Sequence, residues 1–236
     1  MKFKTRYKSC LWSRTDIWGD LIRRKNTFLK VKWDRMIGVL ASKKRRRYQQ
    51  LCKNYNLVRP EMRPNQPYKF PRWAFRNSLS NRVCLRRFYG DLNHHSLYKL
   101  ARGKTLNQFV EVLEMRLDIN LYRLGFFTSI FESRQAILHR KVLVNGQIVN
   151  SGAYLLQSGD LVEFCPTFRN YIKSRFIGSR QKTSYIQRPK IKPTPFWIHT
   201  DYASLSFIVR GGATLCIFYP FRVELDNILF SLKYGY

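Results

Sequence analysis

Between residues 106 and 124, apolar residues recur at steps of three and four positions, which is the spacing of one face of an α-helix. These residues are Leu106, Val110, Leu113, Leu117, Leu121 and Leu124. Thr105 and Gln108 have the spacing of a capping box at the start of this helix, and Gly125 is placed to end it. The pattern therefore predicts an amphipathic helix over this stretch.

A second helix is predicted directly afterwards, because Ser129 and Glu132 repeat the capping-box spacing. Its apolar stripe consists of Ile130, Phe131, Ile137 and Leu138. The pattern then changes to short apolar runs that flank Asn145-Gly146, a pair typical of a hairpin turn in which both residues have positive φ. After Ser158-Gly159-Asp160, the run Leu161–Phe164 is predicted as a further strand. Residues 106–165 thus read as a small α/β module of two helices, a hairpin and a strand.

The segments on either side of this module are less regular. Residues 59–73 contain four prolines and are predicted to be extended. Residues 166–192 are polar and basic, and we expect a linker there. In residues 193–236, the runs SLSFIVR and TLCIFYPF have strand character, and FRVELDNILFSLKY is predicted to form a last helix or strand. The predicted fold class is α+β, with domain limits at 1–105, 106–165, 166–192 and 193–236.

Charge is distributed very unevenly along the chain, whose formal net charge is +30. Residues 1–105 hold 28 Lys and Arg against 5 Asp and Glu, and residues 166–192 hold 8 against none. The module, 106–165, holds 5 against 6. A polyanion is the expected partner, since neutralising phosphates releases condensed counterions. The densest basic block is Lys43, Lys44, Arg45, Arg46 and Arg47. Trp and Tyr residues around it favour either an arm that orders against RNA or an independently folded helical unit.

Several function classes are not expected from the residues present. No run approaches the roughly 18 apolar residues of a membrane span, and the basic N-terminus lacks the apolar region of a signal peptide. The five cysteines lie far apart, so we expect free thiols and no metal site. No phosphate-binding glycine loop or nucleophilic triad is recognised. We therefore expect neither cofactor nor catalysis.

The stretches RLDINLYRLGF, SRQAILHRKVLVNGQIVN and LLQSGDLVEF resemble the RNA-binding domain of the S4 family of small-subunit ribosomal proteins. LRRFYGDLN at Leu85–Asn93 and, more loosely, FRVELDNILFSLKY resemble other parts of the same family. The opening KFKTRYKSCLW is similar to that of mitochondrial members, with a plastid location as the alternative. The family geometry also implies a bend or break of the first helix near Met115–Arg116.

The resemblance implies a structural protein that binds the 5′ domain of small-subunit ribosomal RNA early in assembly. It also implies an S5-type protein neighbour, a place near the channel through which mRNA enters, no membrane, no homo-oligomer, and a C-terminal segment packed on a mainly helical N-terminal body. The RNA-facing residues that it implies are Arg116, Arg123, Arg134, His139, Arg140, Lys141 and Asn145, and Arg86 and Arg87 are further candidates for RNA binding. Arg140 and Lys141, directly before the hairpin, are the strongest candidates for phosphate contacts.

Two positions leave alternatives open. Arg134 falls within the apolar stripe of the second helix, so it either forms a buried pair, with Asp118 as the candidate partner, or passes between helices to RNA. Ile130 stands where family members usually carry a basic residue, which favours affinity located in the flanking basic segments. A stand-alone RNA chaperone or stress factor with the same domain is the alternative function, followed by an RNA-modifying enzyme.

Overall fold

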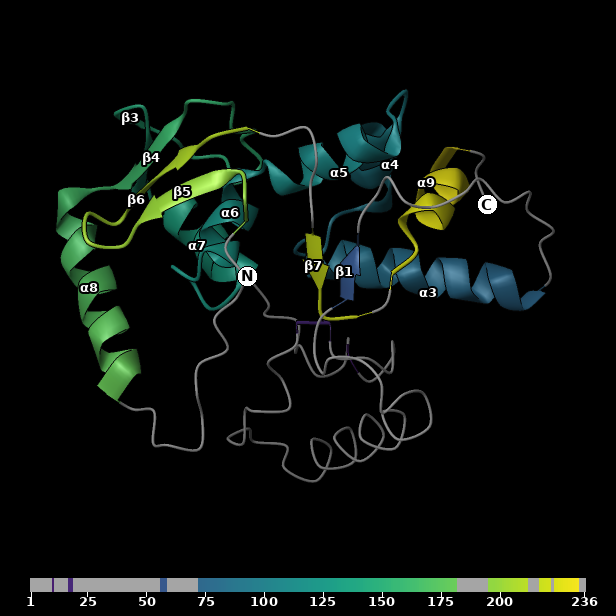
Figure 1. Ribbon diagram of the computed structural model, residues 1–236, viewed down its shortest axis with the longest axis horizontal. Helices are drawn as coiled ribbons and strands as arrows, with labels where there is room; N and C mark the ends of the chain where they lie inside the picture. The colour runs from purple at the N-terminus through teal and green to yellow at the C-terminus, as the bar shows by residue number, and fades with distance from the viewer. Residues whose placement is uncertain are drawn as a thin grey trace. The chain divides into compact units, whose positions relative to one another are not determined.

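The computed structural model describes residues 10, 17–18, 56–58, 72–181, 195–211, 217–221 and 223–233 (Figure 1). For residues 56–58, 72–77, 175–181 and 218 only the backbone is described. The chain divides into two compact units, which are considered separately: residues 1–106 with 217–236, and residues 107–216. None of the helices in these described ranges combines the length and the apolar character that a membrane span requires.

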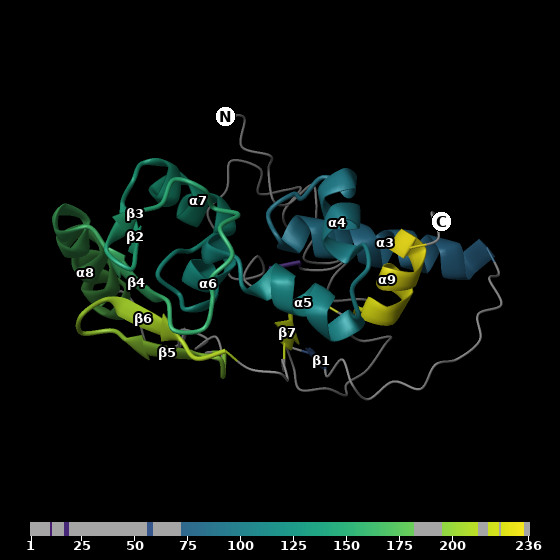
Figure 2. The ribbon, with the colours of Figure 1, turned by 90° about the horizontal axis from the view of Figure 1, so that it is seen from above.

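The described residues of the first unit contain the helices α3 (Arg72–Phe88), α4 (His94–Ala101) and α9 (Leu225–Lys233). Helix α9 packs against both α3 and α4, as both ribbon views show (Figures 1 and 2). Strand β1 (Asn56–Val58) pairs in antiparallel fashion with β7 (Ile217–Tyr219). Helix α9, which follows the second unit in the sequence, therefore packs on two helices that precede that unit.

Aromatic side chains join the two sequence segments of this unit, residues 1–106 and 217–236. Phe88 and Tyr89, at the end of α3, lie edge-on to Tyr219, and the hydroxyls of Tyr89 and Tyr219 are 2.6 Å apart. Phe221 packs on Phe88 and on Tyr219. All four side chains are buried. Because a buried phenol hydroxyl needs a partner, the two tyrosines satisfy each other inside this core.

The second unit begins with α5 (Leu106–Glu114) and α6 (Leu117–Arg123), where the sequence predicted one apolar helical stripe. The break lies at Met115–Arg116, where the family geometry implied it. Arg116 is extended, with φ −68° and ψ 138°. The backbone there pairs with a distant segment: Leu117 N donates to the Tyr154 carbonyl, and Leu156 N donates to the Met115 carbonyl. These long-range bonds replace the helical ones, so the helix ends and restarts.

Helix α7 (Ile130–Leu138) is capped at its N-terminus by Ser129, as predicted. The Ser129 hydroxyl oxygen accepts a hydrogen bond from Glu132 N at 3.2 Å. The Glu132 carboxylate turns back further than the capping box requires and accepts from the backbone and hydroxyl of Thr128 at 3.0 and 2.8 Å. The cap thus satisfies donors that the first turn of the helix would leave unpaired.

The second unit also contains a five-stranded antiparallel sheet with the order β3-β2-β4-β6-β5. Its strands are β2 (Val142–Val144), β3 (Gln147–Ile148), β4 (Leu161–Phe164), β5 (Ile198–Asp201) and β6 (Ser206–Val209). The predicted hairpin links β2 to β3 through Asn145 and Gly146, which have φ values of 51° and 78°. These positive values are those of the turn that matches the twist of paired strands.

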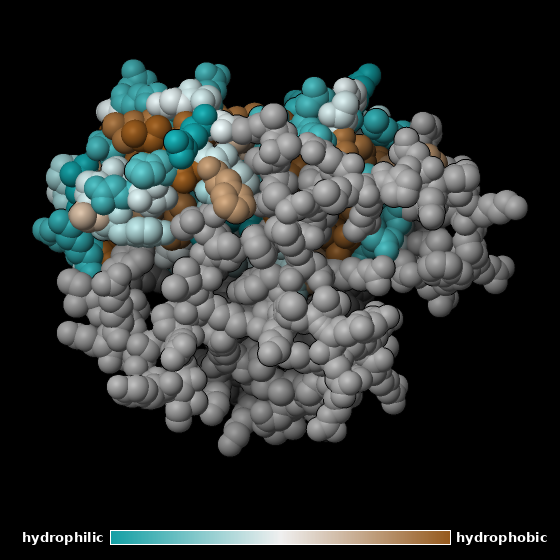
Figure 3. All heavy atoms as spheres, in the orientation of Figure 1, coloured by the Kyte–Doolittle hydropathy of each residue, from teal (hydrophilic) through white to brown (hydrophobic). Residues whose placement is uncertain are grey.

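The two faces of this sheet differ in burial. Val162, Phe164 and Phe207 point into the core, where Phe126 packs on both phenylalanine rings. On the opposite face Ile148 and Ile208 are exposed, and apolar atoms come to the surface over this unit in the space-filling view (Figure 3). One covered and one open face is the usual arrangement of an antiparallel sheet.

The segments that follow β4 differ from the expected domain limits. Residues 166–192 were expected to be a linker, but Pro166–Gln181 form a helix, α8. Residues 193–236 were expected to pack on the N-terminal body as one segment. Instead, β5 and β6 join the sheet of the second unit beside β4, and only the part from Ile217 lies in the first unit. The alternation in SLSFIVR revealed a strand but not its partner, because pairing is decided by long-range burial.

Candidate nucleic-acid interface

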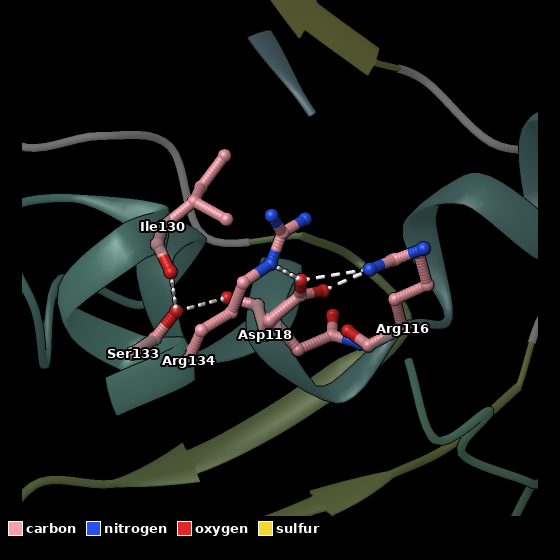
Figure 4. A network of polar contacts seen from close by, with 6 residues as sticks. Arg116, Asp118, Ile130, Ser133 and Arg134 are labelled. Carbon is pink, nitrogen blue, oxygen red and sulfur yellow. Dashed lines mark hydrogen bonds and ion pairs between the residues drawn. The ribbon is translucent and has the colours of Figure 1, made fainter. Parts of the chain in front are cut away.

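Asp118, in the first turn of α6, is the centre of a buried ion-pair network (Figure 4). Its side chain has no solvent exposure. Arg116 donates to both of its carboxylate oxygens, through Nε at 3.0 Å and Nη2 at 2.9 Å. Arg134, from α7, donates through Nε to Oδ2 at 2.6 Å. A buried carboxylate needs such partners because desolvation of an unpaired charge costs several kcal/mol.

The backbone around Asp118 ties three segments together. The Ser133 hydroxyl donates to the Asp118 carbonyl at 2.9 Å, and Asp118 N donates to the Gly152 carbonyl at 3.2 Å. A Cβ atom at Gly152 would lie 3.1 Å from Cγ of Arg134 and 3.5 Å from Cβ of Asp118. A side chain at this position would require Arg134 to shift by a few tenths of an ångström, so glycine suits the close approach of the loop to the ion pairs.

A second buried ion pair spans the break between α5 and α6. Arg123 donates through Nε and Nη2 to the two carboxylate oxygens of Glu114, both at 2.5 Å, and Glu114 is fully buried. Asn120 adds to this joint, since its amide nitrogen donates to the carbonyls of Glu114 and Arg116. The bidentate geometry fixes the angle between the two short helices.

These pairs change the interpretation of three arginines that were expected to face RNA. Side-chain exposure is 9% for Arg116, 10% for Arg123 and 21% for Arg134. Each guanidinium is held by a carboxylate of the same unit. Arg116 and Arg123 do not form one solvated helix face, because Arg116 is the extended residue before α6 and both side chains are largely buried. For Arg134, the pair with Asp118 is the first of the two alternatives left open by the sequence.

The end of α7 presents exposed basic residues. His139 and Arg140 are exposed and Lys141 is half-buried. Arg140 N donates to the Ile137 carbonyl, and Lys141 N donates to the Ala136 carbonyl. These two hydrogen bonds end the helix at a residue with a left-handed backbone conformation. That residue is Arg140, whose φ is 57°. Glycine is preferred there on steric grounds, so the arginine at this position holds a strained backbone conformation.

Asn145 was also expected to face RNA, but its amide serves the fold. Its Nδ2 donates to Oδ1 of Asp160 at 2.9 Å, and its Oδ1 accepts from Leu161 N at 2.9 Å. Asp160 in turn accepts from Gln157 N at 2.7 Å. These bonds attach the hairpin turn to the loop that leads into β4.

Replacing Gly146 with alanine should lower the free energy of unfolding by about 1 kcal/mol, because a Cβ atom disfavours its φ of 78°. Urea unfolding of the full chain provides the measurement. Gln147→Ala, at the next and exposed position, is the matched control and should change stability by less than about 0.5 kcal/mol. Equal stability of the Gly146 variant and the parent would contradict the assigned turn.

In the first unit, basic residues gather where α3 meets α4. Arg86 donates through Nε to the Leu92 carbonyl at 2.6 Å, and Arg87 is half-buried beside it in sequence. Nη1 of Arg82 lies 3.3 Å from Nε2 of His94. Burial, followed by the nearby charges of Arg82, Arg86 and His95, lowers the pKa of His94 below its usual value. Burial and the charge of Arg86 likewise lower the pKa of Arg82. This concentration of positive charge suits a phosphate partner.

Not every predicted residue can be placed, and sequence reasoning missed others. The block Lys43–Arg47 lies outside the described residues. The roles of Glu114 and Gly152 were not foreseen, although six acidic residues against five basic ones in 106–165 already indicated internal pairing. In the described part of the chain, no group of His, Cys, Asp and Glu could hold a metal ion.

Comparison with known proteins adds a family signal to this geometry. Residues 115–162 match the S4 domain. The chain is 30% identical over 169 residues to the small ribosomal subunit protein uS4m of Reclinomonas americana, covering 69% of this chain and 66% of that protein. It is 31% identical to uS4 of Nitrosospira multiformis (52% and 58% covered) and of Cereibacter sphaeroides (66% and 74% covered). The chain thus spans less than two thirds of the length of the first two relatives.

Proposed function

Because this chain belongs to the uS4 family of small ribosomal subunit proteins, we propose that it is a structural, non-catalytic component of a small ribosomal subunit and binds that subunit's RNA. The observation that carries this proposal is the match of residues 115–162 to the S4 domain, together with the alignment that covers 74% of the C. sphaeroides protein. The net charge of +30 supports a nucleic-acid partner.

The direct test uses the full chain and a transcript of the 5′ domain of small-subunit ribosomal RNA. Binding should be retained in competition with an unrelated RNA of equal length, and the protein should co-sediment with small subunits through a high-salt wash. A stand-alone RNA chaperone, the alternative function, would leave the particles in that wash. Absence of binding to the transcript would overturn the proposal.

The residues proposed to face RNA are His139, Arg140 and Lys141 at the end of α7 and Arg86 and Arg87 in α3, none of which is fully buried. The basic block 43–47 is included on its charge alone. Arg116, Arg123 and Asn145 are assigned structural roles, because their side chains are bonded within the protein. Arg134 holds Asp118 through Nε. In this proposal the protein recognises the shape and the phosphates of the RNA, because side chains cannot read the deep and narrow major groove of A-form RNA.

The Arg140→Gly variant separates stability from binding. Glycine relieves the strain of φ 57°, so the free energy of unfolding should stay constant or rise by up to about 1 kcal/mol. Loss of one phosphate contact should weaken binding to the 5′-domain transcript roughly 5-fold at physiological salt. Arg140→Lys keeps the charge and is the control. Parental RNA affinity in the glycine variant would exclude Arg140 from the interface.

The location and the neighbours are also proposed from the family membership. The R. americana relative is a mitochondrial uS4m, which favours a mitochondrial ribosome, with a plastid ribosome as the alternative. An S5-type neighbour and a place beside the path of incoming mRNA are part of the same proposal. Crosslinking of the assembled particle, followed by identification of the linked proteins, tests both.

A further inference from the structure

Three aromatic rings form a column that leads from the core of the second unit to its surface along α8. The ring of Phe127, 2% exposed, is nearly parallel to that of Phe168, with 22° between planes and 6.4 Å between centroids. Phe168 in turn stacks on Tyr171, at 26° and 5.3 Å. Phe168 and Tyr171 are three positions apart, so they share one face of the helix.

The column ends in a ring that is open to solvent. Tyr171 is 54% exposed although one of its faces lies against Phe168. Helix α8 starts at the end of β4, and its later turns run beyond the sheet (Figure 1). The inner end is fixed, because Phe164 packs on both Phe127 and Phe168, and Ile172, next to Tyr171, is buried. Tyr171 is therefore a rigidly backed aromatic platform.

We propose that Tyr171 is a stacking site for an unpaired RNA base. Single-stranded loops and bulges offer bases that stack on exposed aromatic side chains, and every base has a face that such a ring accepts. The column supplies the preorganisation, since Phe168 holds the tyrosine ring before the base arrives. This proposal rests on the proposed RNA-binding function and names the part of the RNA that one site takes.

The charge of the surrounding segment favours RNA over a protein partner. Residues 164–200 contain eight Lys and Arg and no Asp or Glu. Lys173 is exposed two positions after Tyr171, and Arg169, two positions before it, keeps a side-chain exposure of 34% beside Glu163. The exposed ring lies within a basic segment, so base stacking can combine with attraction of that segment to the backbone phosphates of a single strand.

The test uses the full chain and a single-stranded RNA of about 12 nucleotides, a length within the range that one stacking site covers. It carries 2-aminopurine, whose fluorescence falls on stacking, and the same strand in a duplex is the comparison. Tyr171→Leu should weaken single-strand binding roughly 5- to 100-fold and remove the quenching. Tyr171→Phe should retain both, because the ring makes the contact. Tyr98→Leu, at an exposed tyrosine of the other unit, is the matched control.

The outcomes separate this proposal from its premise. Parental binding and quenching in Tyr171→Leu would overturn the stacking site, as would an equal loss on single strand and duplex. Unchanged RNA affinity with reduced incorporation into small subunits would assign Tyr171 to a protein contact instead. Failure of the parental chain to bind the 5′-domain transcript would instead reject the proposed function. Thermal unfolding of each variant shows whether the fold is retained.

Discussion

The Asp118→Asn variant is expected to lose about 3–5 kcal/mol of the free energy of unfolding of the second unit. Asparagine keeps the shape of the side chain but removes the charge that holds Arg116 and Arg134. Arg116 has only 9% of its side chain exposed, so its guanidinium would remain buried without a counterion. The loss is large because the desolvation cost of the remaining buried guanidinium is no longer offset by an opposite charge.

Hydrogen exchange in increasing urea provides the measurement, read on peptides from α6 and α7. This readout reports the second unit separately, which matters because a chain of two units need not unfold in one step. Glu163→Gln is the matched control. It breaks a pair with Arg169 at 3.6 Å in which both side chains are about one third exposed, and it should cost less than about 1 kcal/mol. Similar losses in the two variants would contradict the structural role of Asp118.

Replacing all five residues of the Lys43–Arg47 block with glutamine is expected to have the largest effect on RNA affinity. If each cation meets one phosphate, the slope of log K against log salt should become shallower by about 3.5–4.5, and affinity at physiological salt should fall about 10²- to 10³-fold. Titration of the 5′-domain transcript over a range of salt concentrations measures both quantities.

Two comparisons sharpen this experiment. Exchanging lysines for arginines within the block, and arginines for lysines, keeps the charge and should keep the slope. The second unit alone should show a shallow slope, because residues 106–165 carry nearly balanced charge. The fragment for that comparison is 107–216 rather than 106–165, since β5 and β6 complete the sheet. A glutamine variant with the parental slope would show that the block does not contact the RNA backbone.

Local signals in the sequence predicted local structure well. Ser129 caps α7 and Asn145-Gly146 forms the hairpin turn, because short-range hydrogen bonding and φ preferences decide such features. Long-range features were not predictable in the same way. The pair of Glu114 with Arg123 needs a helix break between residues nine positions apart, and the partner of β6 lies across a helix and a basic segment.

The candidate site shows the same division. The resemblance drew attention to the basic residues from Arg116 to Lys141, but residue type alone could not separate those that hold the fold from those at the surface. Asp118 was recognised as a candidate partner of Arg134, whereas its stronger attachment to Arg116 depends on the extended backbone at that residue. Burial decides the role of an arginine, and burial is a property of the assembled unit.

The split of the C-terminal segment between the two units sets an order for folding during synthesis. All five strands of the sheet in the second unit have left the ribosome once Val209 has emerged, whereas the first unit still lacks β7 and α9 at that moment. The second unit can therefore form its native contacts before the first unit, because α3 and α4 pack against α9, which emerges last. A nascent chain halted when residue 216 has just emerged from the ribosome would already carry a complete sheet, while α3 and α4 would still lack α9.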